Sequence, residues 1–300
     1  MFLGRGLTTQ PGRVDEDDWL RSFEAPYNQT ARGRVTARTL LPNYDNLERA
    51  ALAHMSVDVQ RACDIEASAQ GTDAWHDARR DRFTGSCYNR MAGGCRFSNS
   101  ERSLRDLLWY KSISGNADMA RGHQFEPHAR DLYLDWRLME YEDGRLQLRP
   151  QSVDEKGIIV LPQRPWMGYS PDGIVHDGDG KMQLIEIKAP RKIKPQINPD
   201  YMAQMQGGMW LLKQKYGEDH MQYCDFVQAE KACWHDPCQE CECYMFNIKV
   251  ERVPYNDDYA RRLVLNLSDK WLNEYLPRMV MRDANLLERG RFDPVTRVNL

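Results

Sequence analysis

The feature that most constrains the fold is a β-hairpin pattern, SPDGIVHDGDGKMQLIEIKAP, at residues 170–190. Its centre, Asp-Gly-Asp-Gly at 177–180, is typical of a tight turn between two strands. If residues 178–180 form the loop, antiparallel pairing places Asp172 opposite Glu186. Side chains alternate along a strand, so Glu186 and Lys188 share one face, and Ile185 and Ile187 point to the other. The hairpin therefore predicts two carboxylates and one ammonium group close together.

This grouping of charges has a chemical use. Two carboxylates hold Mg²⁺, a hard cation that prefers oxygen ligands and keeps several waters. The ion then polarises a phosphodiester and activates water, and a nearby lysine orients that water or stabilises developing negative charge. The alternative is a surface hairpin with an exposed charged face, which is the usual setting of a Glu-x-Lys pattern in a strand. The centred turn and the Pro171-Asp172 pair favour the metal site over the surface hairpin.

Composition limits the class of protein. The chain has 300 residues, 41% hydrophobic and 28% charged, as expected for one large globular domain or two small ones. No apolar run suits a signal peptide or a membrane span, so we expect an intracellular protein without a membrane partner. Its compartment would be the bacterial cytoplasm for a phage or bacterial source, and the host nucleus or cytoplasm for a eukaryotic virus. A net charge of −3 does not suit a protein that coats nucleic acid, but a DNA-acting enzyme needs only a local positive path.

Hydrophobic periodicity predicts a mixed α/β chain without internal repeats. The clearest helix covers 118–139, where one apolar stripe contains Phe125, Ala129, Leu132, Tyr133 and Trp136. Further helices are expected at 46–68, 199–216 and 257–281, the last capped by Asn256. Strands are expected at 158–161, 167–176, 182–188, 223–228 and 243–252. We expect an N-terminal extension over 1–60 with a short helix near Trp19 to Phe23, a main domain over 61–285 with a Cys-rich insert at 229–243, and a tail at 286–300.

Five ordered blocks resemble the phage lambda exonuclease and YqaJ viral recombinase family of the PD-(D/E)xK nuclease superfamily. They are WHDARRDRFTGS (75–86), GHQFEPHAR (122–130), SPDGIVHDGDG (170–180), IEIKAP (185–190) and YMAQMQGGMW (201–210). The resemblance covers roughly residues 70–215. It implies a restriction-endonuclease-like core, with a central mixed β-sheet flanked by helices. Ala189 stands where the family often has cysteine, a departure that should be tolerated.

The resemblance also implies roles for the catalytic residues. Asp172 and Glu186 would bind the metal, helped by the backbone carbonyl of Ile187, and Lys188 would position the attacking water. Mg²⁺ is the expected ion, and Mn²⁺ is expected to substitute. Glu126 matches a helix-borne acid of the family near the metals, although its own sequence context predicts only a solvated glutamate beside the apolar stripe.

A second set of residues matches the family's contacts to a terminal 5′-phosphate. Arg79 matches the arginine, whose planar fork suits phosphate oxygens, while Thr84 and Ser86 would add hydroxyl and backbone donors. Gln204 matches a family glutamine near the phosphate and metal site. Polar spacing on an amphipathic helix is the alternative for Gln204 and its neighbour Gln206. We interpret Arg80 and Arg82 as solvated charges, and Tyr201, Met205 and Met209 as packing residues.

Two segments keep open alternatives. Arg191, Lys192 and Lys194 line a DNA path or form an exposed basic loop. The segment CWHDPCQECEC contains Cys233, Cys238, Cys241 and Cys243, and the Cys238-x-x-Cys241 spacing suits zinc or an iron–sulfur cluster. A loop of free thiols is the favoured alternative, because there is no second well-spaced pair.

The expected function is that of a 5′→3′ exonuclease on double-stranded DNA ends, which leaves 3′ single strands for recombination or viral genome processing. The family further implies a ring-shaped homotrimer, and a single-strand annealing protein is a possible partner. One rival is an endonuclease or structure-selective nuclease on the same core, which would cut closed circular DNA. The other is a non-catalytic DNA-binding recombination protein. An intact Asp172, Glu186 and Lys188 set argues against the latter, since a disused site has no physical reason to keep clustered like charges.

Overall fold

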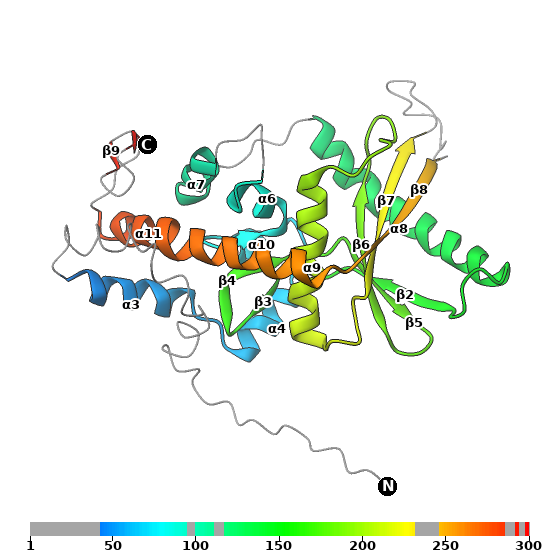
Figure 1. Ribbon diagram of the computed structural model, residues 1–300, viewed down its shortest axis with the longest axis horizontal. Helices are drawn as coiled ribbons and strands as arrows, with labels where there is room; N and C mark the ends of the chain where they lie inside the picture. The colour runs from blue at the N-terminus through cyan, green and yellow to red at the C-terminus, as the bar shows by residue number, and fades with distance from the viewer. Residues whose placement is uncertain are drawn as a thin grey trace, which may run out of the picture.

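The computed structural model describes residues 43–94, 100–110, 117–231 and 246–285, together with strands β9 (Phe292–Asp293) and β10 (Val298–Asn299). The helix predicted near Trp19 to Phe23 lies outside these residues. The chain has a mixed α/β fold built from two mixed sheets and the helices around them (Figure 1).

The larger sheet contains the predicted hairpin. Its five strands are β2 (Pro150–Asp154), β5 (Gly173–Asp177), β6 (Met182–Lys188), β7 (Tyr223–Lys231) and β8 (Phe246–Pro254), hydrogen-bonded in that order. Only β6 and β7 run parallel; the other neighbours are antiparallel. In the hairpin, Gly173 pairs with Ile185 and His176 pairs with Met182. This is the register predicted from a loop at residues 178–180, and it directs Asp172 toward Glu186.

The smaller sheet supports the start of the hairpin. It contains β1 (Phe83–Thr84), β4 (Arg164–Tyr169) and β3 (Ile159–Leu161), in the order β1-β4-β3. The single strand predicted over 167–176 is therefore wrong: β4 and β5 belong to different sheets and are separated by Ser170–Asp172. Pro171 explains the break, because proline lacks the N–H that a continuous strand would donate.

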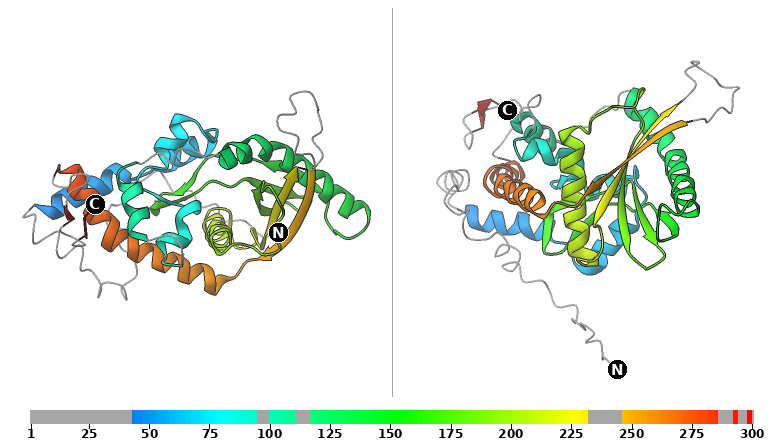
Figure 2. Two further views of the ribbon diagram at one scale, coloured as in Figure 1. Left: turned by 90° about the horizontal axis from the view of Figure 1, so that it is seen from above. Right: turned by 45° about the vertical axis from the view of Figure 1, so that its right-hand side comes forward.

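Two long helices cover opposite faces of the larger sheet (Figures 1 and 2). They are α8 (Ala117–Glu142) and α9 (Pro199–Tyr216), close to the predicted ranges. Ala129 and Tyr133 of α8 pack with Ile185 and Ile187 in one apolar cluster. Leu184 belongs to the main core, which contains α9. The face of β6 that bears Glu186 is therefore the α9 face, as strand alternation predicts.

Two predicted helices are divided. The pattern over 46–68 forms α3 (Tyr44–Met55) and α4 (Val59–Ala67), separated where the Asp58 side chain caps α4 by accepting a hydrogen bond from the backbone N–H of Arg61 (2.7 Å). The last helix consists of α10 (Asp257–Lys270), the π-helical turn η3 (Trp271–Tyr275) and α11 (Leu276–Asp283). Asn256 caps α10 as predicted, since its side chain accepts from the N–H of Tyr259. The short helices are α5 (Asp73–Ala78), η2 (Gly85–Cys87), α6 (Tyr88–Met91) and α7 (Ser100–Leu108).

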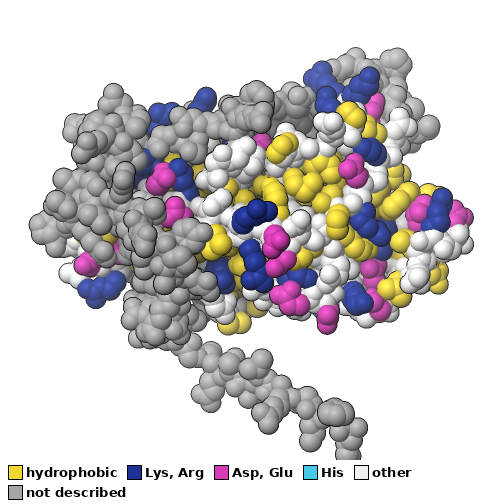
Figure 3. All heavy atoms as spheres, in the orientation of Figure 1, with side chains coloured by type: hydrophobic (Ala, Val, Ile, Leu, Met, Phe, Trp, Pro, Cys, Tyr) yellow, Lys and Arg dark blue, Asp and Glu magenta, His cyan; other side chains and the backbone are white. Residues whose placement is uncertain are grey.

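The main hydrophobic core joins segments that are far apart in the sequence. Tyr44 and Leu52 of α3 share it with Trp166 of β4, Met209 of α9 and Trp271 of η3. Within the described part of the chain, no helix combines the length and the apolar character needed to cross a membrane. On the face shown in Figure 3, Lys and Arg side chains are interspersed with Asp and Glu, and they form no single large basic surface among the described residues.

Candidate active site

Asp172, Glu186 and Lys188 meet where β6 ends. The Ile187 N–H donates to Asp172 Oδ2 (2.7 Å), which holds this carboxylate at the strand end. Lys188 Nζ contacts Glu186 Oε1 and lies 3.6 Å from Asp172 Oδ2. The ammonium group therefore lies against both carboxylates, as the hairpin register predicts.

The Glu186 carboxyl is fully buried and held by a residue that sequence reasoning missed. The Tyr169 hydroxyl, at the end of β4, donates to Glu186 Oε2 (2.9 Å). Burial, with help from the Asp172 charge, raises the pKa of Glu186 to about 7. Burial acts to lower the pKa of Lys188, but Glu186 and Asp172 outweigh it and the pKa rises. The only available signal for Tyr169 was its place just before the Ser170-Pro171-Asp172 turn.

Glu126 reaches the site from α8 through a second residue that was missed, Arg130. Arg130 Nη2 lies 3.2 Å from Glu126 Oε1, and Nε donates to the backbone carbonyl of Asp172 (2.9 Å). Its remaining nitrogen, Nη1, pairs with Glu155 Oε2 (3.0 Å). Burial, followed by the Asp172 charge, raises the pKa of Glu126 to about 8. The i,i+4 spacing of Glu126 and Arg130 on one helix was the signal for this pair.

The oxygen atoms of this cluster fit a hard divalent cation. The Lys188 ammonium lies against Asp172 and Glu186, so this position stabilises positive charge. Carboxylate and carbonyl oxygens are the ligands that Mg²⁺ accepts, with water completing the shell. Among the described residues, no group of three His, Cys, Asp or Glu side chains lies close enough together to hold a metal ion without other ligands. Cys233, Cys238, Cys241 and Cys243 lie outside the described residues.

A second cluster forms around Arg79, which follows α5. Arg79 Nη2 donates to Thr84 Oγ1 (3.1 Å), and Nη1 lies 3.4 Å from Ser170 Oγ. Trp75 Nε1 also donates to Ser170 Oγ (3.0 Å), and the Arg79 guanidinium lies 4.2 Å from the centre of a Trp75 ring. Burial lowers the pKa of Arg79, which means that the cation is poorly solvated. Sequence reasoning missed Ser170, and only its place before Pro171-Asp172 suggested it.

Ser86 and Gln204 flank this cluster. Ser86 is exposed on η2. Gln204 lies on α9, where its Cγ would be 3.1 Å from a Cβ placed on Gly85.

The two other arginines of the segment that follows α5, Arg80 and Arg82, have different surroundings. Arg80 is exposed and paired with Asp77, as expected, whereas Arg82 is partly buried and donates to the backbone carbonyls of Ala78 and Met55, so it is not simply a solvated charge.

The segment Tyr169–Asp172 joins the two clusters. Tyr169 and Asp172 contribute to the Glu186–Lys188 cluster, while Ser170 contributes to the Arg79 cluster. Pro171 lies between them and is held by Gln70, whose side-chain amide donates to its carbonyl (3.0 Å). Four consecutive residues therefore fix the position of one cluster relative to the other.

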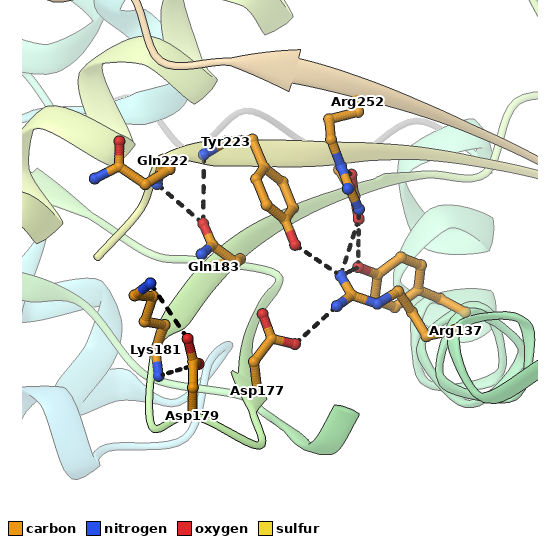
Figure 4. Close-up of polar contacts among 10 residues, drawn as sticks. Arg137, Asp177, Asp179, Lys181, Gln183, Gln222, Tyr223 and Arg252 are labelled. Atoms are coloured by element: carbon orange, nitrogen blue, oxygen red, sulfur yellow. Dashed lines mark hydrogen bonds and ion pairs between the residues drawn. The ribbon is translucent and has the colours of Figure 1, made fainter. Parts of the chain in front are cut away.

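A buried ionic network fixes α8, the helix that bears Glu126, against the sheet (Figure 4). Arg137 is almost completely buried and pairs with Asp177 of β5 (2.7 Å) and Asp225 of β7 (3.3 Å). Arg252 of β8 pairs with Asp225 from the other side (2.9 Å), and Tyr223 OH lies 3.1 Å from Arg137 Nη1. The negative charges of two carboxylates thus balance the positive charges of two guanidinium groups. The network holds α8 at Arg137, eleven residues beyond Glu126.

The basic loop after β6 is ordered and exposed. The Ile193 N–H donates to Glu230 Oε2 (2.9 Å) and the Lys194 N–H to Gln228 Oε1 (2.8 Å). Gln228 Nε2 in turn donates to the Lys194 carbonyl (2.9 Å). Arg191, Lys192 and Lys194 are exposed in this loop, directly after the Glu186–Lys188 cluster.

Comparison with known proteins gives a family and related structures. Residues 74–214 match the YqaJ-like viral recombinase domain. The crystal structure of an alkaline exonuclease, LHK-Exo, from Laribacter hongkongensis matches with a TM-score of 0.51 and 25% identity, covering 72% of this chain and 100% of that one. The structure of LHK-Exo in complex with dAMP matches with a TM-score of 0.50, the same identity and the same coverage. A search of curated protein sequences gives no match.

These similarities agree with the blocks recognised in the sequence. The matched residues include Arg79, Glu126, Ser170, Asp172, Glu186, Lys188 and Gln204. The fold that surrounds them is that of the alkaline exonuclease structures. Residues 74–214 are therefore similar to the YqaJ-like viral recombinase domain, by family model and by fold.

Proposed function

We propose that the protein is a metal-dependent DNA exonuclease that digests double-stranded ends from 5′ to 3′ and leaves 3′ single strands. The observation that supports it most is that Tyr169–Asp172 contributes both to a carboxylate–lysine cluster and to an arginine–hydroxyl cluster. The first suits phosphodiester hydrolysis and the second suits a terminal phosphate. The exonuclease activity of the related LHK-Exo and its complex with dAMP support a DNA substrate.

In this proposal, Asp172, Glu186 and the Ile187 carbonyl hold Mg²⁺, which Mn²⁺ can replace, and Glu126 assists from α8. The bound ion would supply Lewis-acid polarisation of the phosphodiester and a more acidic water. Tyr169 and Arg130 keep Glu186 and Glu126 in place by the hydrogen bonds described above. The remainder of the PD-(D/E)xK assignment, with a nuclease domain over 61–285, is part of the same proposal.

Lys188 acts on the attacking water and on the charge that develops during the reaction. Its Nζ donates a hydrogen bond that orients the water toward the phosphorus. The same cation stabilises negative charge as it builds on the phosphate oxygens. The Tyr201 ring lies 5.1 Å from Nζ and limits the positions that this long side chain can take.

The terminal 5′-phosphate is bound by the Arg79 cluster and the residues next to it: Arg79, Thr84, Ser86, Ser170 and Gln204. A phosphate oxygen can replace the neutral hydroxyl acceptors of Arg79 with a charged acceptor, which makes a stronger hydrogen bond. Binding of the DNA end at this point would set which phosphodiester reaches Lys188.

By family resemblance, we also propose that the protein forms a homotrimer around the DNA. A monomeric mass by light scattering, with and without DNA, would contradict the trimer.

The test is digestion of a linear duplex labelled separately at its 5′ and 3′ ends, with a covalently closed circle alongside. We expect the 5′ label to be released first in Mg²⁺ and the circle to survive. EDTA and Lys188→Ala should abolish cleavage while the variant still binds DNA.

Each other outcome identifies a rival. Cleavage of the circle would indicate an endonuclease on the same core. Earlier loss of the 3′ label would reverse the polarity. DNA binding without cleavage in either Mg²⁺ or Mn²⁺ would indicate a binding protein and contradict the proposal.

A further inference from the structure

Asp81 is the buried centre of a polar cluster that the proposed catalytic chemistry does not use. Its carboxylate accepts hydrogen bonds from the hydroxyl groups of Tyr110 and Tyr275. Arg282 binds both carboxylate oxygens, with Nη1–Oδ1 at 2.9 Å and Nη2–Oδ2 at 3.2 Å. Trp271 Nε1 donates to the Asp81 backbone carbonyl (3.1 Å). These five residues are called the Asp81 hub below.

Without these partners, the backbone conformation and the burial of Asp81 would both cost free energy of folding. Its φ is +59°, in the left-handed region that suits glycine, and the residue is 6% exposed. A left-handed non-glycine residue persists only where its surroundings compensate for the strain. A buried carboxylate likewise needs a paired cation and hydrogen-bond donors. The bidentate Arg282 fork and the two tyrosines supply both, so the hub holds the backbone of residue 81 in one conformation.

Three of the four partners, all except Tyr110, come from outside the residues that the family comparison matches. Trp271 and Tyr275 are the first and last residues of η3, and Arg282 lies on α11, whereas the match ends at residue 214. A π-helical turn widens the helix and often marks a functional position. In this turn, both aromatic side chains reach the same residue, one at its backbone and one at its carboxylate.

The segment fixed by the hub is the one that presents the Arg79 cluster. Asp81 lies two residues after Arg79 and three before Thr84, and those two side chains bind each other. Phe83 packs edge-on against the Tyr275 ring, with centroids 5.7 Å apart, and it pairs with Met167 of β4. Two strand positions later, β4 ends at Tyr169, next to Ser170. The hub is thus connected to both sides of the Arg79 cluster.

We infer that Asp81 is a positioning residue for recognition of a 5′-phosphorylated DNA end, and that Tyr275 and Arg282 complete this site from the C-terminal helices. The inference rests on the proposed function and assigns to it a dependence on residues outside 74–214. The hub does not touch the phosphate. It fixes the Arg79–Thr84 segment so that the Arg79 guanidinium and the hydroxyls around it face one phosphate position.

The test compares duplexes that differ only in a 5′-phosphate or a 5′-hydroxyl. Affinity is measured by fluorescence anisotropy in EDTA, where no cleavage occurs, and cleavage is measured separately in Mg²⁺. The full-length wild type should bind the phosphorylated end more tightly. Asp81→Asn keeps the size of the side chain but turns an NH₂ toward Arg282. It should lower the phosphate-to-hydroxyl affinity ratio by roughly tenfold or bring it to one, the effect of about one charge-assisted hydrogen bond, with affinity for the hydroxyl end unchanged.

Asp177→Asn is the matched control. Asp177 is similarly buried and also pairs with an arginine, Arg137, but it lies on β5, in the other sheet from the strand that follows Asp81. It should cost stability like Asp81→Asn and leave the phosphate-to-hydroxyl ratio as in the wild type. If Asp81→Asn does not fold, Tyr275→Phe and Arg282→Lys replace it. Each keeps part of the hub, so each should lower the ratio by a smaller factor.

The outcomes separate the hub from the nuclease proposal. An unchanged ratio in folded hub variants, or a wild type that binds both ends equally in EDTA, would overturn the inference whether or not the protein cleaves DNA. A phosphate preference that falls in the hub variants supports it. Absence of cleavage in Mg²⁺ alongside such a preference would contradict only the nuclease proposal.

Discussion

At the scale of single residues, Tyr169 offers the sharpest test of the metal site. Its hydroxyl donates to the fully buried Glu186 carboxyl and favours the ionised form that a metal needs. Tyr169→Phe keeps the ring and removes this donor. We expect the Mg²⁺ concentration for half-maximal cleavage to rise severalfold, with a loss of about 1 kcal/mol in the free energy of unfolding. Titration of activity with Mg²⁺ and urea denaturation measure the two effects.

Tyr133→Phe is the control for this change. Tyr133 is also fully buried, and its hydroxyl donates to a buried carboxylate, Asp225 (2.7 Å), on the other face of the sheet. A similar loss of stability with no change in Mg²⁺ dependence is expected. An equal shift of the Mg²⁺ requirement in both variants would mean that Tyr169 acts only through the fold.

The two glutamates of the site predict how the stability of the metal-free protein depends on pH. Burial raises the pKa of Glu186 to about 7 and that of Glu126 to about 8, both from an ordinary 4.5. Between these values the folded protein binds more protons than the unfolded chain, so its stability should fall as the pH rises from about 5 to about 8. Melting temperatures in EDTA across this range test it. Glu186→Gln should flatten the slope, and a rising melting temperature would contradict the prediction.

At the scale of elements, α9 depends on a glycine that admits an aromatic ring. A Cβ on Gly208 would lie 2.5 Å from the Tyr169 ring. Gly208→Ala should therefore lower the free energy of unfolding by about 1–3 kcal/mol despite the better helix propensity of alanine. It should also reduce cleavage, since Tyr169 must move away from Glu186.

Gly122 of α8 provides the matched comparison. It is also a helix glycine, but a Cβ there would meet nothing within 4 Å. Gly122→Ala should raise the free energy of unfolding by about 0.5–1 kcal/mol. Urea denaturation of both variants tests the pair, and a stabilised Gly208→Ala would show that the ring can shift at no cost.

At the scale of the whole molecule, we expect that the matched residues 74–214 do not fold as an independent unit. Residues 74–214 lack β7, the parallel neighbour of β6, as well as α10, η3 and α11, which share the main core with β4 and α9. A 74–214 fragment would expose one edge of β6 and much of this core. We expect it to show no cooperative thermal unfolding by circular dichroism, whereas a 43–285 fragment should melt cooperatively. A cooperative transition in the shorter fragment would refute this.

The sequence by itself determined the local architecture and the centre of the site. The turn at 177–180 and the two-residue period of strands predicted the pairing of β5 with β6, and with it the meeting of Asp172, Glu186 and Lys188. Both signals are local, since loop length and strand alternation set the register of a hairpin. Apolar periodicity located α8 and α9 for the same reason.

Only the tertiary structure decided what surrounds that centre. Arg79 meets Ser170 across 91 positions, and Asp81 meets Arg282 across 201. Neither pair leaves a periodic or spacing signal, because each depends on how whole elements pack. Tyr169 and Arg130 lie beside recognised motifs, yet their hydrogen bonds to Glu186, Glu126 and Asp172 required the two sheets and α8 to be placed together. Contacts set by turns and periodicity can be predicted from one sequence, whereas contacts created by the packing of distant elements follow only from the folded chain.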